Sequence, residues 1–357
     1  MKGTGFFLSV LMIMTCLTFS RCKKSDNTSS NQPERKKYAW VVGQKDSTGF
    51  GMILFSADCG ETWTRQGQDT ATLKDISLYD VWAVDENNVW AVGSDNAILT
   101  TRDGGKNWVR IAAPSLPSKP RLSAISIVNK TNIWISGTEG TVYNSADNGK
   151  TWNVFDTAFF PRALMQGICA VTPQKVYVVG GDGGASPRGF IGFTLDGGAT
   201  WNSLVPENDF NKHEWIGVTS YGNTIVVYGG NSFYLVSTDG GANWKNDSVK
   251  TNGGGGVGAD LNHLMMLDNR TWWGAFDMNR VYMTADGGSV WADQQTDVSG
   301  EFLIGIDAWN NSNALAVGES SGWPQLGSVL KYSAITGNWE TKKTLRSNLS
   351  KISFVKP

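Results

Sequence analysis

The sequence predicts an all-β fold, a seven-bladed β-propeller that is closed by pairing of the C-terminal strand with the first blade. Three observations lead to this prediction. One short motif recurs along the chain at nearly constant spacing, and the chain begins and ends with complementary parts of a repeat. The 357 residues also include 42 Gly and 16 Trp, a composition typical of all-β repeat proteins with many tight turns and large buried rings.

The recurring motif has the form Ser/Thr-x-Asp-x-Gly-x-x-Trp. Its copies are SADCGETW (Ser56–Trp63), TRDGGKNW (Thr101–Trp108), SADNGKTW (Ser145–Trp152), TLDGGATW (Thr194–Trp201), STDGGANW (Ser237–Trp244) and TADGGSVW (Thr284–Trp291). Consecutive motif Asp residues lie 43 to 49 positions apart. A degenerate seventh copy, SAITGNW (Ser333–Trp339), lacks the Asp but ends 48 positions after Trp291. A period near 45 residues matches one four-stranded propeller blade.

Each repeat is predicted to contain four strands. An innermost apolar strand such as LSAISIVN (Leu122–Asn129) is followed by a second strand that ends in Gly, such as NIWISG (Asn132–Gly137). A third strand such as TVYNS (Thr141–Ser145) leads into the motif, and the fourth begins at the motif Trp. The motif is therefore expected at the hairpin between the third and fourth strands.

The two ends of the chain predict how the ring closes. The first repeat opens with KYAWVVG (Lys37–Gly43), a second-type strand with no innermost strand before it. The chain finishes with LSKISFVK (Leu349–Lys356), an innermost-type strand with no second strand after it. Pairing of these two segments completes the first blade and removes exposed sheet edges.

The motif residues are predicted to be structural. The Asp carboxylate accepts hydrogen bonds from its own turn, the Gly supplies a positive φ angle, and the Trp fills the space between blades. This applies to Asp58, Asp103, Asp147, Asp196, Asp239 and Asp286. A catalytic or metal-binding role is the alternative, but it would require equivalent sites all around one ring. Ile335 near the Asp position of the last copy also indicates that the carboxylate is dispensable there.

The motif resembles the Asp-box, or bacterial neuraminidase repeat. Asp-boxes occur in sialidases, xyloglucan hydrolases, sortilin-type receptors and assembly factors, so the motif alone names no function. The longer segment VWAVDENNVWAVGSDNAILTTRDGGKNW (Val81–Trp108) is similar to the repeat of the photosystem II stability/assembly factor family. This resemblance implies a non-catalytic propeller that serves as a scaffold or binding platform for other proteins.

The N-terminus is predicted to be a targeting segment. Residues 1–21 are predicted to be a signal peptide, 22–36 a polar tether and 37–357 the propeller. Lys2 precedes a short apolar run, Phe6–Phe19, and Cys22 follows it, an order that resembles a bacterial lipoprotein signal. Arg21 departs from the usual small residue, so ordinary secretion and a retained anchor are the alternatives. The expected location is the bacterial cell envelope, periplasmic or on the outer surface, with lipid on Cys22.

Composition and the rarer residue types exclude several classes of function. Lys and Arg number 31 against 32 Asp and Glu, which gives no field for binding nucleic acid. Cys59 and Cys169 lie in different repeats, and so do His213 and His263. Neither a disulfide framework nor a zinc site is therefore expected, and no motif predicts a cofactor.

A partner-binding surface is predicted where the second strands turn into the third strands and where one blade connects to the next. Long variable loops on a rigid scaffold are typical sites of function. Arginines on this face are expected to converge near the channel mouth and grip an acidic or carboxylate-bearing partner, with aromatic residues as apolar anchors. The residues are Arg121, Arg162, Arg188 and Arg280, with Phe159, Phe160, Trp215 and Trp323. The alternative is solvated loop arginines and aromatic residues that pack between blades.

A carbohydrate-active protein, either a glycan binder or a divergent sialidase-like glycoside hydrolase, is the alternative function. The nearest string to the early sialidase signature is FPRA (Phe160–Ala163), which has a changed order and lies well inside the chain. Asp182, Glu214 and Glu301 are candidate acids, but a glycosidase needs a pair at a defined separation. The sequence therefore favours a protein without catalytic activity.

Overall fold

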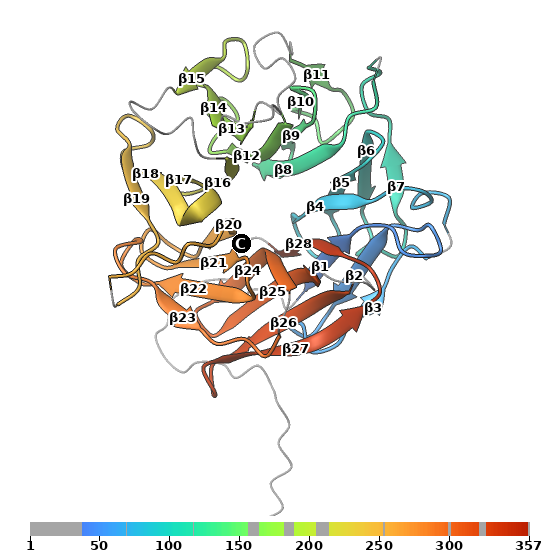
Figure 1. The fold of residues 1–357 in the computed structure, drawn as a ribbon. Helices are drawn as coiled ribbons and strands as arrows, with labels where there is room; N and C mark the ends of the chain where they lie inside the picture. Colours follow the sequence, from blue (N-terminus) through green and yellow to red (C-terminus); the bar gives the residue numbers. More distant parts are fainter. Residues whose placement is uncertain are drawn as a thin grey trace, which may run out of the picture. The chain divides into compact units, whose positions relative to one another are not determined.

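The computed structural model describes residues 38–68, 70–116, 118–155, 164–181, 189–204, 214–252, 254–298, 301–320 and 326–355. These residues form seven four-stranded antiparallel sheets arranged as blades around a central axis (Figure 1). The predicted signal peptide, the tether and Cys22 lie outside the described residues. Within the described residues, no helix has the length and apolar character needed to cross a membrane.

The blades are numbered here in chain order. From the axis outward, the first four contain these strands: β28 (Leu349–Phe354), β1 (Ala39–Gly43), β2 (Met52–Ser56), β3 (Thr64–Arg65); β4 (Leu78–Ala83), β5 (Val89–Gly93), β6 (Ala97–Thr101), β7 (Val109–Ile111); β8 (Leu122–Val128), β9 (Asn132–Gly137), β10 (Val142–Ser145), β11 (Asn153–Val154); β12 (Leu164–Ala170), β13 (Val176–Gly181), β14 (Gly189–Thr194) and β15 (Asn202–Leu204).

The remaining three blades follow the same order: β16 (Trp215–Tyr221), β17 (Thr224–Gly229), β18 (Phe233–Ser237), β19 (Lys245–Ser248); β20 (Leu261–Met266), β21 (Trp272–Phe276), β22 (Arg280–Thr284), β23 (Ala292–Gln294); β24 (Glu301–Asn310), β25 (Asn313–Ser320), β26 (Gly327–Ser333) and β27 (Asn338–Leu345). A 3₁₀ turn, η3 (Gly230–Ser232), joins β17 to β18. The seven-bladed, all-β prediction is confirmed.

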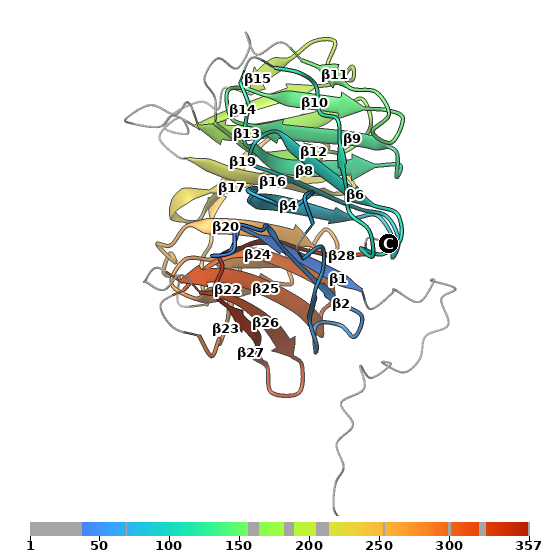
Figure 2. The same cartoon turned by 90° about the vertical axis from the view of Figure 1, so that its right-hand side faces the viewer.

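The ring closes where the sequence predicted. β28 pairs antiparallel with β1, with Ala39 opposite Phe354 and Val41 opposite Ile352, and the two strands lie side by side in both views (Figure 1, Figure 2). Two lysines of blade 7 add a polar contact, because Lys331 Nζ and Lys342 Nζ lie 2.6 and 3.2 Å from the Glu61 carboxylate of blade 1. The two ends of the chain are thus joined by backbone pairing within blade 1, and blade 7 is joined to blade 1 by charge.

Separate apolar clusters between neighbouring blades hold the ring together. Trp291 packs with Val226 and Tyr234 of the preceding blade, and Trp339 packs with Trp273 of its own preceding blade. Trp291 and Trp339 are almost fully buried. The predicted role of the motif Trp as a plug between blades is confirmed at these positions. Cys59 and Cys169 are buried and form no disulfide with each other.

Each complete Asp-box is a hydrogen-bonded turn. In blade 4, the Thr194 hydroxyl donates to Asp196 Oδ1 at 2.8 Å and accepts from the Gly198 N–H at 2.9 Å. The Thr200 N–H and hydroxyl donate to the two carboxylate oxygens at 2.9 and 2.6 Å. Hydrogen bonds from Thr200 and Thr194 hold the pKa of Asp196 at about 2. Because the folded-state value lies below the ordinary 3.8, this stabilisation is present above pH 3.8 and is lost as the pH falls toward 2.

Thr194→Val is expected to destabilise the fold by about 1–3 kcal/mol, because it keeps the side-chain shape but leaves the buried Gly198 N–H without its acceptor. The measurement is urea unfolding followed by circular dichroism. Thr344→Val is the matched control, since Thr344 is exposed on β27 and its hydroxyl has no hydrogen-bond partner among the described residues. Equal midpoints for the two variants would contradict this role of the box.

Candidate functional site

The two rims of the ring differ in character. One rim, here called the Asp-box face, carries the Asp-box turns. The other carries the turns between second and third strands and the connections between blades, and is called the connection face. Its described second-to-third-strand turns are residues 44–51, 94–96, 138–141, 230–232 and 277–279.

Arg121 lies on the connection face, directly before β8. Its guanidinium carbon lies 5.1 Å from the ring centroid of Tyr79, which belongs to the inner strand of the preceding blade. Thr138 holds the backbone of Arg121, because its hydroxyl accepts from the Arg121 N–H at 3.0 Å and its N–H donates to the Arg121 carbonyl at 2.9 Å. The result is an exposed arginine fixed over an aromatic ring.

Arg280 is placed differently from the prediction. It begins β22, the third strand of its blade, and therefore does not line the inner rim at the channel mouth. Its guanidinium donates to Tyr282 Oη at 2.7 Å and to Asp293 Oδ2 at 3.1 Å. These contacts within its own blade stabilise the outer strands of blade 6.

Trp215 is a core residue, so its expected position as a surface anchor is wrong. Its side chain is 1% exposed and packs with Tyr177 and Val227. It lies opposite Gly229 of the second strand, the place where the other inner strands have a buried Leu or Met, such as Leu78 or Met165. The sequence argument placed Trp215 in the connection between blades 4 and 5. In the structure, β16 already begins at Trp215. Arg162, Arg188, Phe159, Phe160, Trp323 and His213 lie outside the described residues.

Carboxyl groups lie on the connection face of blades 6 and 7, and the sequence argument had named only Glu301 among them. Burial raises the pKa of Asp277, Glu301 and Glu319. Glu301 is 9% exposed, and its Oε1 accepts from the Ser328 hydroxyl at 2.7 Å. Its Oε2 is buried without a hydrogen-bond partner among the described residues. The sequence shows acidic residues at the ends of these strands. It does not show that they are buried, because burial depends on the tertiary structure.

Glu301→Gln is expected to stabilise the protein at pH 8 by on the order of 1 kcal/mol, because it removes a buried charge with one unsatisfied oxygen. The folded-state pKa of Glu301 lies above its ordinary 4.5. Its favourable contribution is therefore complete below pH 4.5 and is lost as the pH rises through the folded-state pKa. Thermal unfolding from pH 4 to pH 8 should show a gap between the proteins at pH 8 that closes at pH 4. A constant gap would contradict the assignment.

Of the candidate acids for glycoside hydrolysis, Glu214 lies directly before the inner strand of blade 5 and Glu301 begins that of blade 7. Glu214 accepts a hydrogen bond from the Gln166 amide, and Asp182 lies outside the described residues. The described ranges contain no group of three or more His, Cys, Asp or Glu residues placed to hold a metal ion.

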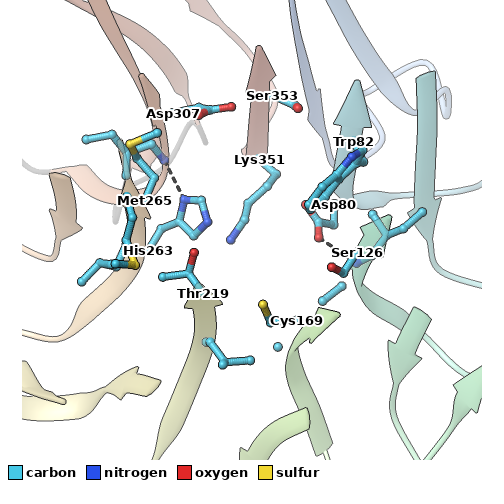
Figure 3. A pocket seen from close by; sticks show the side chains of 18 of the residues that line it. Asp80, Trp82, Ser126, Cys169, Thr219, His263, Met265, Asp307, Lys351 and Ser353 are labelled. Atoms are coloured by element: carbon cyan, nitrogen blue, oxygen red, sulfur yellow. Dashed lines mark hydrogen bonds between the residues drawn. The ribbon is translucent and has the colours of Figure 1, made fainter. Parts of the chain in front are cut away.

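A cavity of about 370 Å³ runs between the seven inner strands. Its lining includes Asp80, Cys169, His263, Asp307 and Lys351, each from a different blade (Figure 3). The Cys169 thiol lies 3.2 Å from the Ser220 hydroxyl, and burial raises its pKa to about 11, which keeps it protonated at neutral pH. Cys169 is therefore an unreactive wall residue.

Polar side chains of this lining connect neighbouring inner strands. Asp80 Oδ2 accepts from the Ile125 N–H at 2.9 Å, and His263 Nδ1 accepts from the Ile306 N–H at 3.0 Å. Asp307 Oδ2 accepts in the same way from the Phe354 N–H at 2.8 Å. Because each contact crosses from one blade to the next, these side chains explain polar residues in otherwise apolar strands.

Part of this chain matches the model of a known protein family. Residues 31–153 match the family model described as photosynthesis system II assembly factor YCF48. The resemblance predicted from the repeats is confirmed over this part of the chain. No curated protein sequence matches the chain.

The fold is shared with several solved structures. A structure of YCF48 bound to D1 peptide is 16% identical, with a TM-score of 0.56, and the match covers 85% of this chain and 84% of that one. YCF48 from Cyanidioschyzon merolae is 17% identical, with a TM-score of 0.56 and coverage of 84% and 97%. The GH74 xyloglucanase from Xanthomonas campestris is 12% identical, with a TM-score of 0.56 and coverage of 83% and 52%. At these identities the likeness establishes the fold alone.

Proposed function

We propose that this chain is a non-catalytic propeller of the cell envelope that acts as a protein-binding scaffold or assembly and stability factor. The match of residues 31–153 to an assembly factor family carries the proposal. The solved structure of YCF48 bound to D1 peptide supports it, because a propeller of the same fold binds a peptide there.

Docking is assigned to the connection face of blades 2 and 3, around Arg121. Arg and Tyr are the residue types enriched at interaction hot spots, and Arg121 is exposed while its guanidinium stacks on Tyr79. Like charge costs free energy across an interface, so ionised carboxyl groups on blades 6 and 7 would disfavour an acidic segment there. This favours blades 2 and 3 for a carboxylate-bearing partner.

Affinity capture from native envelope membranes, followed by mass spectrometry, tests this function. Proteins enriched by the wild-type propeller should be depleted with Arg121→Ala. They should be retained with Arg102→Ala, a matched variant of an exposed arginine in an Asp-box turn on the opposite face. Equal recovery with both variants would refute the docking residue, and the absence of any specifically enriched protein would refute the scaffold.

Anchoring through Cys22 is part of the proposal. A lipid on this residue would hold the propeller at a membrane surface without a spanning helix. Cys22→Ser is expected to move the protein from the membrane fraction to the soluble fraction. Unchanged membrane recovery would contradict the anchor while leaving the binding function open to its own test.

A carbohydrate-active role is the second candidate, favoured by the shared fold with a GH74 xyloglucanase. Xyloglucan and a sialylated oligosaccharide are the substrates to use, with release of reducing ends or free sialic acid as the measurement. We expect no release above a heat-treated control. Hydrolysis that is abolished by Glu301→Gln would replace the scaffold assignment with a glycoside hydrolase.

A further inference from the structure

Lys351 occupies a position that recurs in each inner strand. In the other blades the residue at this position contacts the neighbouring blade. Each inner strand has a buried apolar residue opposite a residue near the end of its second strand, as in Leu122 opposite Gly137 and Leu303 opposite Gly318. The residue two positions later faces the next blade. These residues are Asp80, Ala124, Gly167, Gly217, His263, Gly305 and Lys351. A Cβ added to Gly167 would lie 2.8 Å from the Gly217 Cα, and one added to Gly305 would lie 3.2 Å from the Lys351 Cα. The position therefore takes either a small residue or an acceptor for the neighbouring strand.

Lys351 fits neither of these roles. A lysine ammonium donates hydrogen bonds and cannot accept one from a backbone N–H. The N–H groups that it would meet in blade 2 already have acceptors, since Asp80 Oδ1 accepts from Val81 at 2.8 Å and Ser353 Oγ accepts from Ala83 at 3.1 Å. Instead, the side chain extends into the middle of the cavity (Figure 3).

The Lys351 ammonium makes no hydrogen bond with any residue that the structure describes, and Asp80 is the charged group among them that acts on it. Burial lowers the pKa of Lys351, and the negative charge of Asp80 opposes this effect. Asp80 therefore compensates the ammonium only in part, and an ammonium in a cavity without a hydrogen-bonded partner costs free energy. An anionic ligand that accepts a hydrogen bond from this ammonium would offset that cost.

The groups around the ammonium define the chemistry of such a ligand. Both oxygens of Asp80 accept from backbone N–H groups, and so do both oxygens of Asp307. His263 Nδ1 accepts a hydrogen bond, so the imidazole is neutral and its proton is on Nε2. The Thr219 hydroxyl lines the same space. The cavity thus holds one cation and a hydroxyl donor beside two carboxylates whose oxygens are each engaged by a backbone N–H group. The group that can form a hydrogen-bonded pair with the cation is an anionic oxygen acceptor.

Apolar side chains line the rest of the cavity. Trp82, Met265 and Trp309 belong to its wall, and a volume of about 370 Å³ is that of a small-molecule site. We propose that the central cavity binds a small organic carboxylate, whose carboxylate pairs with Lys351 and whose hydrocarbon part contacts these apolar residues. The site is separate from the docking surface around Arg121, so each stands or falls by its own experiment.

Hexanoate, hexanamide and inorganic phosphate are the probes that test the site. Titration calorimetry gives the affinities, and the methyl signals of ¹³C-labelled methionine report the location through Met265. Hexanoate should shift the Met265 signal and bind about tenfold or more tightly than hexanamide, which has the same chain without the charge. Equal affinity of the two would overturn the proposal. Binding of phosphate in preference to hexanoate would also overturn it, since the site would then be one for inorganic anions.

Lys351→Met keeps the length of the side chain without the charge, and should weaken hexanoate binding about tenfold or more. Lys74→Met is the matched control, because Lys74 is exposed, and it should leave the affinity unchanged. Unchanged affinity in Lys351→Met would overturn the assignment. The comparison of hexanoate with hexanamide on the wild-type protein needs no variant and decides the question if Lys351→Met does not fold.

Discussion

A chain that ends at Asn348 is expected to lose its cooperative unfolding transition. This truncation removes β28, whose Leu349, Ile352 and Phe354 are 0, 3 and 4% exposed. Burial of an apolar side chain of this size contributes about 1.5–3 kcal/mol. The three together are worth roughly 5–9 kcal/mol, comparable to the whole net stability of about 5–15 kcal/mol for a folded domain.

The position of β28 increases this effect. Phe354 donates its N–H to Asp307 of blade 7, and Ser353 accepts from the Ala83 N–H of blade 2, while the strand itself pairs with β1. Its removal therefore opens two blade interfaces as well as one sheet. Differential scanning calorimetry is the measurement, and a chain that ends at Val355 is the control that keeps the strand. A truncated chain that melts like this control would refute the closure argument, whereas a synthetic peptide of residues 347–357 should restore the transition.

Gly137→Ala is expected to cost about 3 kcal/mol or more. A Cβ at this position would lie 2.4 Å from the Arg121 carbonyl oxygen and 3.2 Å from the Leu122 Cα. Both contacts are with backbone atoms, which cannot turn away as a flexible side chain can. The inner strand also carries a bulge between Leu122 and Ala124, which brings its backbone over the glycine.

The matched control is Gly255→Ala, because a Cβ there would meet no atom within 4 Å. Its effect should stay within about 0.5 kcal/mol. Urea unfolding of both variants gives the comparison. Similar midpoints for Gly137→Ala and the wild type would show that the strands can separate without cost and would contradict the packing argument. The same contact recurs at Gly93, Gly180 and Gly229, which explains why the second strand ends in glycine in these repeats.

Local patterns made the architecture predictable. The Asp-box is a turn in which the residues that bond to one another lie two to four positions apart, as in Ser237, Asp239 and Asn243. The roles of Asp and Gly could therefore be derived from the motif itself. Closure by β28 was also predictable, since an unpaired strand type at each end left one way to satisfy both edges.

The positions of the candidate site residues were less predictable from the sequence. They depend on contacts between blades, which link residues far apart in the chain. Trp215 looked like a surface anchor at the end of a loop, but its place at the start of an inner strand buries it. Arg280 was expected at the channel mouth, yet the third strand of its blade carries it outward to Asp293. Lys351 received no role from the sequence. An alignment of the inner strands would have shown a lysine where the other blades have small or hydrogen-bond-accepting residues.

The sequence by itself determined the number of blades, the turn chemistry of each Asp-box and the strand that closes the ring. All three follow from repetition and from interactions between residues close together in the chain. Only the tertiary structure decided which side chains share the central cavity, which arginine stays exposed and which carboxyl is buried. Asp80, His263 and Lys351 are far apart in sequence, and the cavity that they line exists only after the seventh blade meets the first.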